Sequence, residues 1–373
     1  MTNIKANEAL IDAAKDADIE AMKAALEAGA DVNHRNGKAL IEACEILGRE
    51  ESKALAMVKL LIESGANPNL RACYRPYTAL EQAASSGFVE VVKLLIANGA
   101  IADSDALEAG INESQELVKA LLEAGAVINS CVLWNAAKYG NVEMLKFLGS
   151  QGADVAAASK EQDLIRAAIM GSDSMGLSVS PELIQLLIDL GANVNRRDQL
   201  ESSDPLLRYA VAQYAEKMSF LQKYCREDQV EDYRNRFFGI LECLINAGVD
   251  INAASETWGE TALMEAAAIG EPAIVKMLIE AGADVNAESK LGKKAQPKTS
   301  CTQPQKKEIQ DMLKEARAAV RAAAKAAAKE AAAASGEPKA APKKACAAKS
   351  TAKKTNGTKS TTTKKTTAKK KAE

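Results

Sequence analysis

The sequence predicts an all-α protein, in which a helical repeat solenoid is followed by a C-terminal helix and a disordered basic tail. A short phrase close to Gly-Ala-Asp-Val-Asn returns eight times along the chain, and its glycines are Gly29, Gly65, Gly99, Gly125, Gly152, Gly191, Gly248 and Gly282. A return of about 33 residues is typical of stacked helical repeats. All 14 aromatic residues lie at or before Trp258, so the end of the chain is expected to differ in kind from the repeats.

One repeat unit can be followed in residues 77–99. Its first part, 77–84, predicts a helix with a small, apolar inner face, and Gly87 ends that helix. Its second part, 91–96, predicts a helix with a broad apolar stripe. Gly99 comes next, where a left-handed residue closes a helix without the penalty of a Cβ atom. Such a pair cannot bury its own apolar face, so neighbouring pairs must stack.

This unit resembles the ankyrin repeat family, whose pattern runs from Thr-Pro-Leu-His to Gly-Ala-Asp-Val-Asn. The match is strongest at 77–103 and 261–279, and the resemblance extends over about residues 6–316. The Pro-Leu-His core is nowhere intact, since Ala79 and Ala262 stand where the proline is expected. The resemblance takes in a degenerate last unit that ends in Ile309, Met312 and Leu313.

The resemblance implies an ankyrin repeat domain of about eight to nine units over residues 1–315. It also implies a non-catalytic scaffold or adaptor for an unidentified protein partner, which docks on the finger tips and the adjoining groove of inner helices. The candidate contact residues are His34, Arg35, Arg71, Tyr74, Arg75, Tyr77, Arg196, Arg197 and Trp258. The cluster from Arg71 to Tyr77 is favoured, because Arg and Tyr are enriched in interfaces. Each candidate also fits an ordinary solvated finger tip.

The spacing of the glycines departs from regularity in two places. The intervals of 26 and 27 residues before Gly125 and Gly152 are short by about one finger, so these units are expected to join helix to helix directly. The interval of 57 residues before Gly248 predicts an extended helical hairpin at 204–247. Its first helix has an apolar seam at Leu207, Val211, Tyr214, Met218, Leu221 and Cys225.

The hairpin also holds seven of the 14 aromatic residues of the chain, between Tyr209 and Phe238. Two interpretations are open. The rings can zip the two helices together and cover a neighbouring repeat. Alternatively, the rings that lie off the seam can form a surface for a partner, and these are Tyr209, Phe220 and Tyr224.

The net charge of −2 conceals a strong asymmetry. Residues 335–373 carry a net charge of +10 and residues 287–334 one of +6, which leaves −18 for residues 1–286. Residues 316–334 are rich in alanine and predict a helix, with cations four residues apart at Arg317, Arg321, Lys325 and Lys329. This stripe fits either a solvated spacer or a contact with a polyanion. Residues 335–373 have almost nothing apolar to bury and are expected to be disordered.

The tail resembles the Lys/Ala-rich tails of linker histones and of bacterial histone-like proteins. This resemblance implies salt-dependent, sequence-independent contact with nucleic acid through Lys343, Lys344, Lys353, Lys354, Lys364, Lys365, Lys369, Lys370 and Lys371. Two other interpretations stay open: an inert solubilising tail, and a tail that binds the acidic body of its own chain. The alternative function is accordingly a nucleic-acid-associated regulatory protein whose repeat body is masked by its own tail.

Several other functional classes are not expected. His34 is the only histidine and lies in a predicted turn, and no glycine-rich phosphate loop occurs. The seven cysteines are scattered without a Cys-x-x-Cys pair, which is typical of reduced thiols. No apolar run approaches the roughly 20 residues of a membrane span, and the start lacks an apolar signal core. We therefore expect no enzyme, metal or cofactor, and a cytoplasmic monomer with nucleoid or nuclear association open through the tail.

Overall fold

The computed structural model describes residues 3–45, 50–71, 77–171, 179–196, 204–298 and 301–334. The chain forms two compact units, Met1–Val320 and Arg321–Glu373. Within the described residues the secondary structure is helical apart from one isolated β-bridge between Ala254 and Thr261. The all-α prediction is therefore confirmed.

The first unit is built from pairs of short antiparallel helices. The helices are α1 (Ile4–Lys15), α2 (Ile19–Glu27), α3 (His34–Ala43), α4 (Glu51–Glu63), α5 (Ala79–Ser85), α6 (Val89–Ala97), α7 (Ser104–Gly110), α8 (Gln115–Glu123), α9 (Ser130–Tyr139), α10 (Val142–Ser150), α11 (Val155–Glu161), α12 (Leu164–Met170), α13 (Pro181–Asp189), α14 (Leu206–Tyr224), α15 (Glu227–Asn246), α16 (Ala262–Ile269), α17 (Pro272–Glu280) and α18 (Gln303–Ala334).

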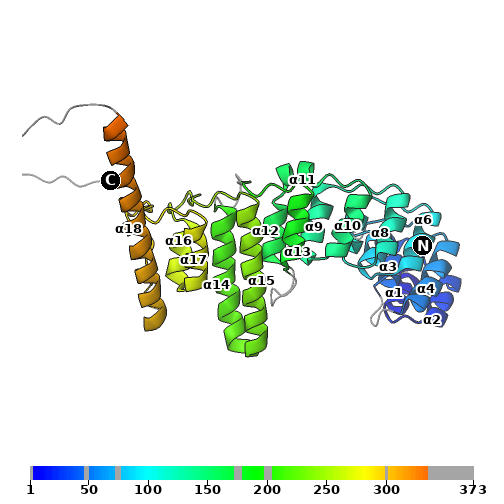
Figure 1. Cartoon of the computed structure of the whole chain (residues 1–373). Coiled ribbons are helices and arrows are strands. Elements are labelled where there is room, and N and C mark those ends of the chain that lie inside the picture. The colour runs from blue at the N-terminus through cyan, green and yellow to red at the C-terminus, as the bar shows by residue number, and fades with distance from the viewer. Residues whose placement is uncertain are drawn as a thin grey trace, which may run out of the picture. The chain divides into compact units, whose positions relative to one another are not determined.

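The pairs stack side by side in a row (Figure 1). The inner helices α1, α3, α5, α7, α9, α12, α14 and α16 each pack on the next inner helix, and the outer helices follow beside them. One continuous cluster of buried apolar side chains runs through the stack from Leu10 to Leu313. Small residues such as Ala83 and Ala84 are fully buried on the inner helices, and their size lets successive pairs approach closely. The predicted solenoid with a shared interior is thus confirmed.

Two units lack a finger, as their glycine spacing predicts. Helix α7 begins at Ser104, only five residues after Gly99, and α9 begins at Ser130, five residues after Gly125. In the next unit, the short helix α11 follows Gly152 and precedes the inner helix α12. The fingered edge of the solenoid is therefore interrupted along α7, α9 and α11.

The extended hairpin is present as α14 and α15, which have 19 and 20 residues where the outer helices α13 and α17 have nine. Both helices project beyond their neighbours in Figure 1. Their rings form the predicted zip: Tyr214 stacks on Phe237 with centroids 4.6 Å apart and lies 6.2 Å from Tyr233. Burial raises the pKa of Tyr214, whose hydroxyl donates to Glu271 at 3.0 Å.

The last residue of the recurring phrase joins one finger to the next. The side-chain amide of Asn69 donates to the carbonyl of Gly99 at 2.8 Å, and its Oδ1 accepts from the backbone N–H of Ile101 at 2.9 Å. Asn33, Asn195 and Asn252 make the same pair of bonds to their own next units. Each bridge satisfies a carbonyl at a helix end, which would otherwise lack a partner.

Where the finger is missing, the same sequence position caps a helix instead. Asp103 follows Gly99 by four residues, and its Oδ1 accepts from the backbone N–H of Ala106 at the start of α7. Asn129 stands four residues after Gly125 and caps α9 through Val132. One position of the repeat thus serves two structures, because both Asn and Asp can accept a bond from a free helical N–H.

The terminal helix differs from its predicted bounds. It begins at Gln303 rather than at residue 316, so the residues expected to end the last unit and the alanine-rich segment form one helix. Ile309 and Leu313 are buried and continue the core of the stack. The first half of α18 therefore closes the solenoid, because apolar burial extends the helix beyond the segment that alanine propensity alone marks out.

We predict that Asn69→Ala lowers the free energy of unfolding by about 1–2 kcal/mol, because it removes both bonds between the finger and the next unit. Asn69→Asp should lose about half as much, since a carboxylate still accepts from Ile101 but cannot donate to Gly99. Urea titration followed by circular dichroism measures both. The control is Asn112→Ala, an exposed asparagine between α7 and α8. An equal effect of Asn69→Ala and the control would contradict the bridging role.

Candidate functional site

A hollow of about 630 Å³ opens on the inner-helix face of the solenoid. We call it the inner-helix hollow, and its walls come mainly from α5, α7 and α9. Its lining residues are Glu45, Arg71, Tyr77, Glu81, Gln82, Ser85, Asp105, Glu108, Ala109, Asn135 and Tyr139. Four of these side chains are carboxylates and two are tyrosine rings, so the hollow combines negative charge with aromatic surface.

Two of the carboxylates occupy equivalent places in successive units. Glu81 follows the core residue Leu80 and Glu108 follows the core residue Leu107, each within an Ala-Leu-Glu triplet. Because α5 and α7 pack side by side, the repeat places both glutamates on the same face. Sequence reasoning missed this pair, although the repeated triplet was a usable signal. It also missed Glu45, Asp105, Asn135 and Tyr139.

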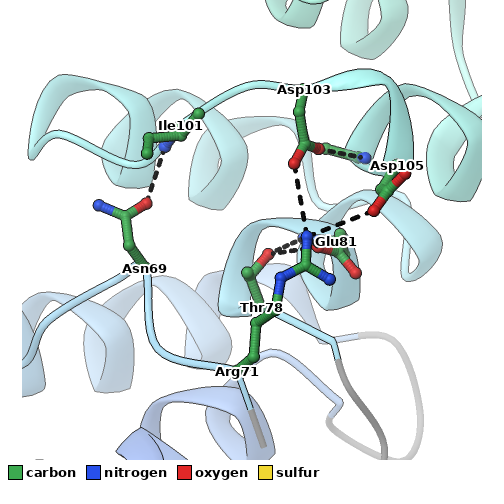
Figure 2. A network of polar contacts seen from close by, with 8 residues as sticks. Asn69, Arg71, Thr78, Glu81, Ile101, Asp103 and Asp105 are labelled. Carbon is green, nitrogen blue, oxygen red and sulfur yellow. Dashed lines mark hydrogen bonds and ion pairs between the residues drawn. The ribbon is translucent and has the colours of Figure 1, made fainter.

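Arg71 organises one side of the hollow, as Figure 2 shows. Its Nη2 lies 3.1 Å from Oε1 of Glu81, and the same atom is 3.3 Å from Asp105 and 3.5 Å from Asp103. Thr78 adds a second restraint, since its Oγ1 caps α5 by accepting from the backbone N–H of Glu81. One guanidinium therefore ties the end of a finger to the starts of α5 and α7.

Burial acts on the acid–base properties of the two equivalent glutamates. It raises the pKa of Glu81, while the Arg71 guanidinium and the bond from Thr78 act in the opposite direction. Burial likewise raises the pKa of Glu108, which approaches the side-chain amide of Asn135 at 3.4 Å. In both cases the surroundings stabilise the ionised carboxylate less well than water would.

The predicted finger-tip residues that the structure describes contact other groups of the chain. His34 and Arg35 both approach Glu8 on α1, at 3.4 Å and 2.8 Å. Arg196 donates to the carbonyls of Ser159 and Glu161 at the end of α11. Arg71 is held by the three carboxylates described above. The predicted candidates Tyr74, Arg75 and Arg197 lie outside the described residues.

The predicted aromatic candidates divide into exposed and covered rings. Tyr77 lines the inner-helix hollow with 48% of its surface exposed, and Trp258 is an exposed ring on the last finger. Phe220 and Tyr224 are exposed on α14, with centroids 4.8 Å apart. Tyr209 differs from the other two off-seam rings, because it is half-buried beneath the guanidinium of Arg166, whose carbon lies 4.3 Å from the ring centroid.

The predicted cationic stripe of the terminal helix also divides. Arg317 is half-buried and donates to the carbonyls of Val285 and Ala295, so it fastens α18 to the segment after the last pair. Arg321, Lys325 and Lys329 are exposed. The tail lysines predicted to bind nucleic acid lie outside the described residues, and they are Lys343, Lys344, Lys353, Lys354, Lys364, Lys365, Lys369, Lys370 and Lys371.

The side chains of the hollow can recognise a ligand by its charge and by contact with the aromatic rings. Carboxylate oxygens of Glu81, Asp103 and Asp105 come within 4.8 Å of one another, but the Arg71 guanidinium already lies among them. Burial raises the pKa of Cys44, which makes its thiol a poor nucleophile. No helix within the described ranges has the length and hydropathy that a membrane span requires.

Comparisons with known proteins agree with the repeat architecture. A family model described as ankyrin repeats (three copies) matches residues 51–131 and 178–289, just over half of the chain. Among solved structures, the ankyrin repeat domain of human ASB11 is similar at 24% sequence identity and a TM-score of 0.42, covering 55% of this chain and 96% of that chain. No curated protein matches the sequence.

We predict that Arg71→Ala makes the stability of the protein fall more steeply as pH rises. Without Arg71 the pKa of Glu81 rises further, so the folded state keeps a proton that the unfolded state has already released. The free energy of unfolding should then decrease from about pH 4.3, the ordinary glutamate pKa, up to the raised value. Urea titrations at a series of pH values measure this slope. Adding Glu81→Gln should remove the extra slope, and an unchanged slope in Arg71→Ala alone would refute the pairing.

Proposed function

We propose that this chain, which belongs to the ankyrin repeat family, is an interaction scaffold whose protein partner docks in the inner-helix hollow. Ankyrin repeats are modules for binding other proteins, and the family is in general not enzymatic. The observation that carries the proposal is the hollow itself, where half-exposed Tyr77 and Tyr139 stand beside the buried carboxylate of Glu81 and the half-buried Glu108. Tyrosine is a frequent anchor of interfaces, because it offers a rigid ring and a polar tip.

The contacts at the finger tips also favour the hollow as the docking site. The finger-tip side chains of His34, Arg35 and Arg196 already contact groups within the chain. A partner that used them would first have to break these contacts, and that cost would subtract from its affinity. Among the described residues, cations lie over the rings of Trp134, Tyr209 and Tyr224, and none lies over Tyr77 or Tyr139.

We further propose that the basic tail tethers the scaffold to nucleic acid and so sets its place in the cell. The support is the net charge of +10 over residues 335–373, together with exposed Arg321, Lys325 and Lys329 on α18. Lysines that neutralise phosphates release counterions, so the contact would depend steeply on salt and little on base sequence.

The docking proposal predicts that the double variant Tyr77→Ala/Tyr139→Ala loses the specific partners that affinity purification recovers with the unaltered chain. The matched control is Tyr224→Ala, which removes an exposed tyrosine from the hairpin instead. The control should retain every partner, and thermal unfolding should show that all three proteins are folded. Loss of the partners with Tyr224→Ala alone would transfer the interface to the hairpin and refute docking in the hollow.

The tether predicts that the full chain shifts duplex DNA or RNA in a gel at low salt, while a chain that ends after Ala334 shifts it at least about tenfold more weakly. This end point is suitable because the described core closes at Leu313 and Arg317 fastens α18. A chain cut after residue 315 would lose that fastening and confuse the comparison. Equal affinity of the two proteins over a salt series would refute the tether.

A further inference from the structure

We infer that the segment which enters the inner-helix hollow is a basic peptide, and that an arginine side chain of the partner is its anchor. The inference rests on the proposed docking function and adds the chemistry of the partner. It starts from the charge of the lining, whose described residues bring together the carboxylates of Glu45, Glu81, Asp105 and Glu108 and the guanidinium of Arg71. A further positive charge would complement this excess.

The positive charge of Arg71 by itself does not neutralise the carboxylates that line the hollow. Its guanidinium already serves Glu81, Asp103 and Asp105, and the third of these carboxylates belongs to the hollow as well. Glu108, on the next inner helix, meets two neutral amides, those of Asn129 and Asn135. Burial raises the pKa of both glutamates, and the neighbouring carboxylate of Asp105 acts in the same direction on each of them.

The two rings favour arginine over lysine. Tyr77 and Tyr139 line the same hollow as the carboxylates and keep 48% and 39% of their surface exposed. A planar guanidinium can stack on a tyrosine ring and donate to a carboxylate at the same time, whereas an ammonium acts as a point charge. An arginine side chain can therefore interact with the carboxylates and with a tyrosine ring of the hollow at once.

The chain contains this arrangement elsewhere as an internal contact. Arg166 stacks on Tyr209 at 4.3 Å while its Nε donates to Asp163 at 3.1 Å. On α14, Arg208 is shared among three carboxylates, those of Asp204, Glu260 and Glu265. The inner face thus accepts guanidinium groups where acids gather, and the hollow offers the same partners to a group from outside.

The other exposed ring pair does not fit the same ligand. Lys223 already lies 5.0 Å from the centroid of the Tyr224 ring beside Phe220, so a second cation would meet repulsion there. The acidic body of the first unit, with a net charge near −18 over residues 1–286, would in addition draw a basic segment toward the solenoid. In the hollow, by contrast, carboxylates lie beside two exposed tyrosine rings.

The test uses a displayed library of random nine-residue peptides, selected on the full chain and counter-selected on Tyr77→Ala/Tyr139→Ala. We expect the surviving peptides to share an arginine. A synthetic copy should bind the chain in fluorescence anisotropy, and a twin with citrulline in place of that arginine should bind at least about tenfold more weakly, since citrulline keeps the shape and loses the charge. Glu108→Gln should weaken the arginine peptide by about five- to tenfold, while Glu63→Gln on the outer helix α4 should leave it unchanged.

The outcomes separate this inference from the docking function. Peptides that depend on the two tyrosines but carry no cation would overturn the arginine anchor and keep docking in the hollow. Failure to select any peptide that depends on the tyrosines would overturn both. If the basic tail of this chain were the natural occupant, the arginine peptide would bind the chain ending at Ala334 more tightly than the full chain, and an external partner would be refuted.

Discussion

Stacking is the constraint on which the rest of this structure depends. A helix pair of some 20 residues has an apolar face that it cannot cover alone, so each unit is stable only between its neighbours. The inner helices meet this need with small residues: Ala83, Ala84 and Ala137 are buried completely and let the backbones approach. The ends of the row need a different solution, and α18 supplies it on one side through Ile309 and Leu313. The helix beyond Leu313 adds no buried apolar side chain among the described residues, so its first half belongs to the fold and its remainder is available for other contacts.

Close stacking creates a second requirement, which concerns polar groups at the repeat edges. Every helix end presents carbonyls without a helical partner, and the fingers bring their own backbone groups beside them. Asn33, Asn69, Asn195 and Asn252 satisfy these groups between fingers. Arg196 does so at the end of the irregular helix α11, and Arg317 of α18 does so for carbonyls in the segment that follows α17. Arginine suits irregular places because its five donors reach several carbonyls at once. Among the described finger-tip arginines, Arg35, Arg71 and Arg196 are held by contacts within the chain, although their residue type alone suggests a binding surface.

Sequence reasoning predicted the parts of the structure that follow from local rules. The glycine spacing gave the helix pairs and the missing fingers, and the apolar steps from Leu207 to Leu221 gave the seam of the hairpin. It could not predict which residues of different units come into contact. Arg71 is distant in sequence from Asp103 and Asp105, and only the stack brings them together. Tyr209 lies off the seam, as predicted, but Arg166 of another unit covers it. The Ala-Leu-Glu triplets at 79–81 and 106–108 could have revealed the paired glutamates, since equal register in adjacent units implies a shared face.

The position of the inner-helix hollow follows from the irregularity of the repeats. Five of its eleven lining residues come from α7 and α9, the inner helices of the two units that lack a finger. In a regular unit, a finger precedes the inner helix and contributes backbone and an asparagine bridge at that edge, as residues 65–71 do before α5. Without it, Asp103 and Asn129 turn to capping, and the exposed faces of α7 and α9 keep their polar and aromatic side chains available. The same shortening that disrupts the fingered edge thus concentrates Asp105, Glu108, Asn135 and Tyr139 on one accessible surface. A solenoid of identical units would spread such groups evenly, whereas here they are gathered where two shortened units follow a regular one.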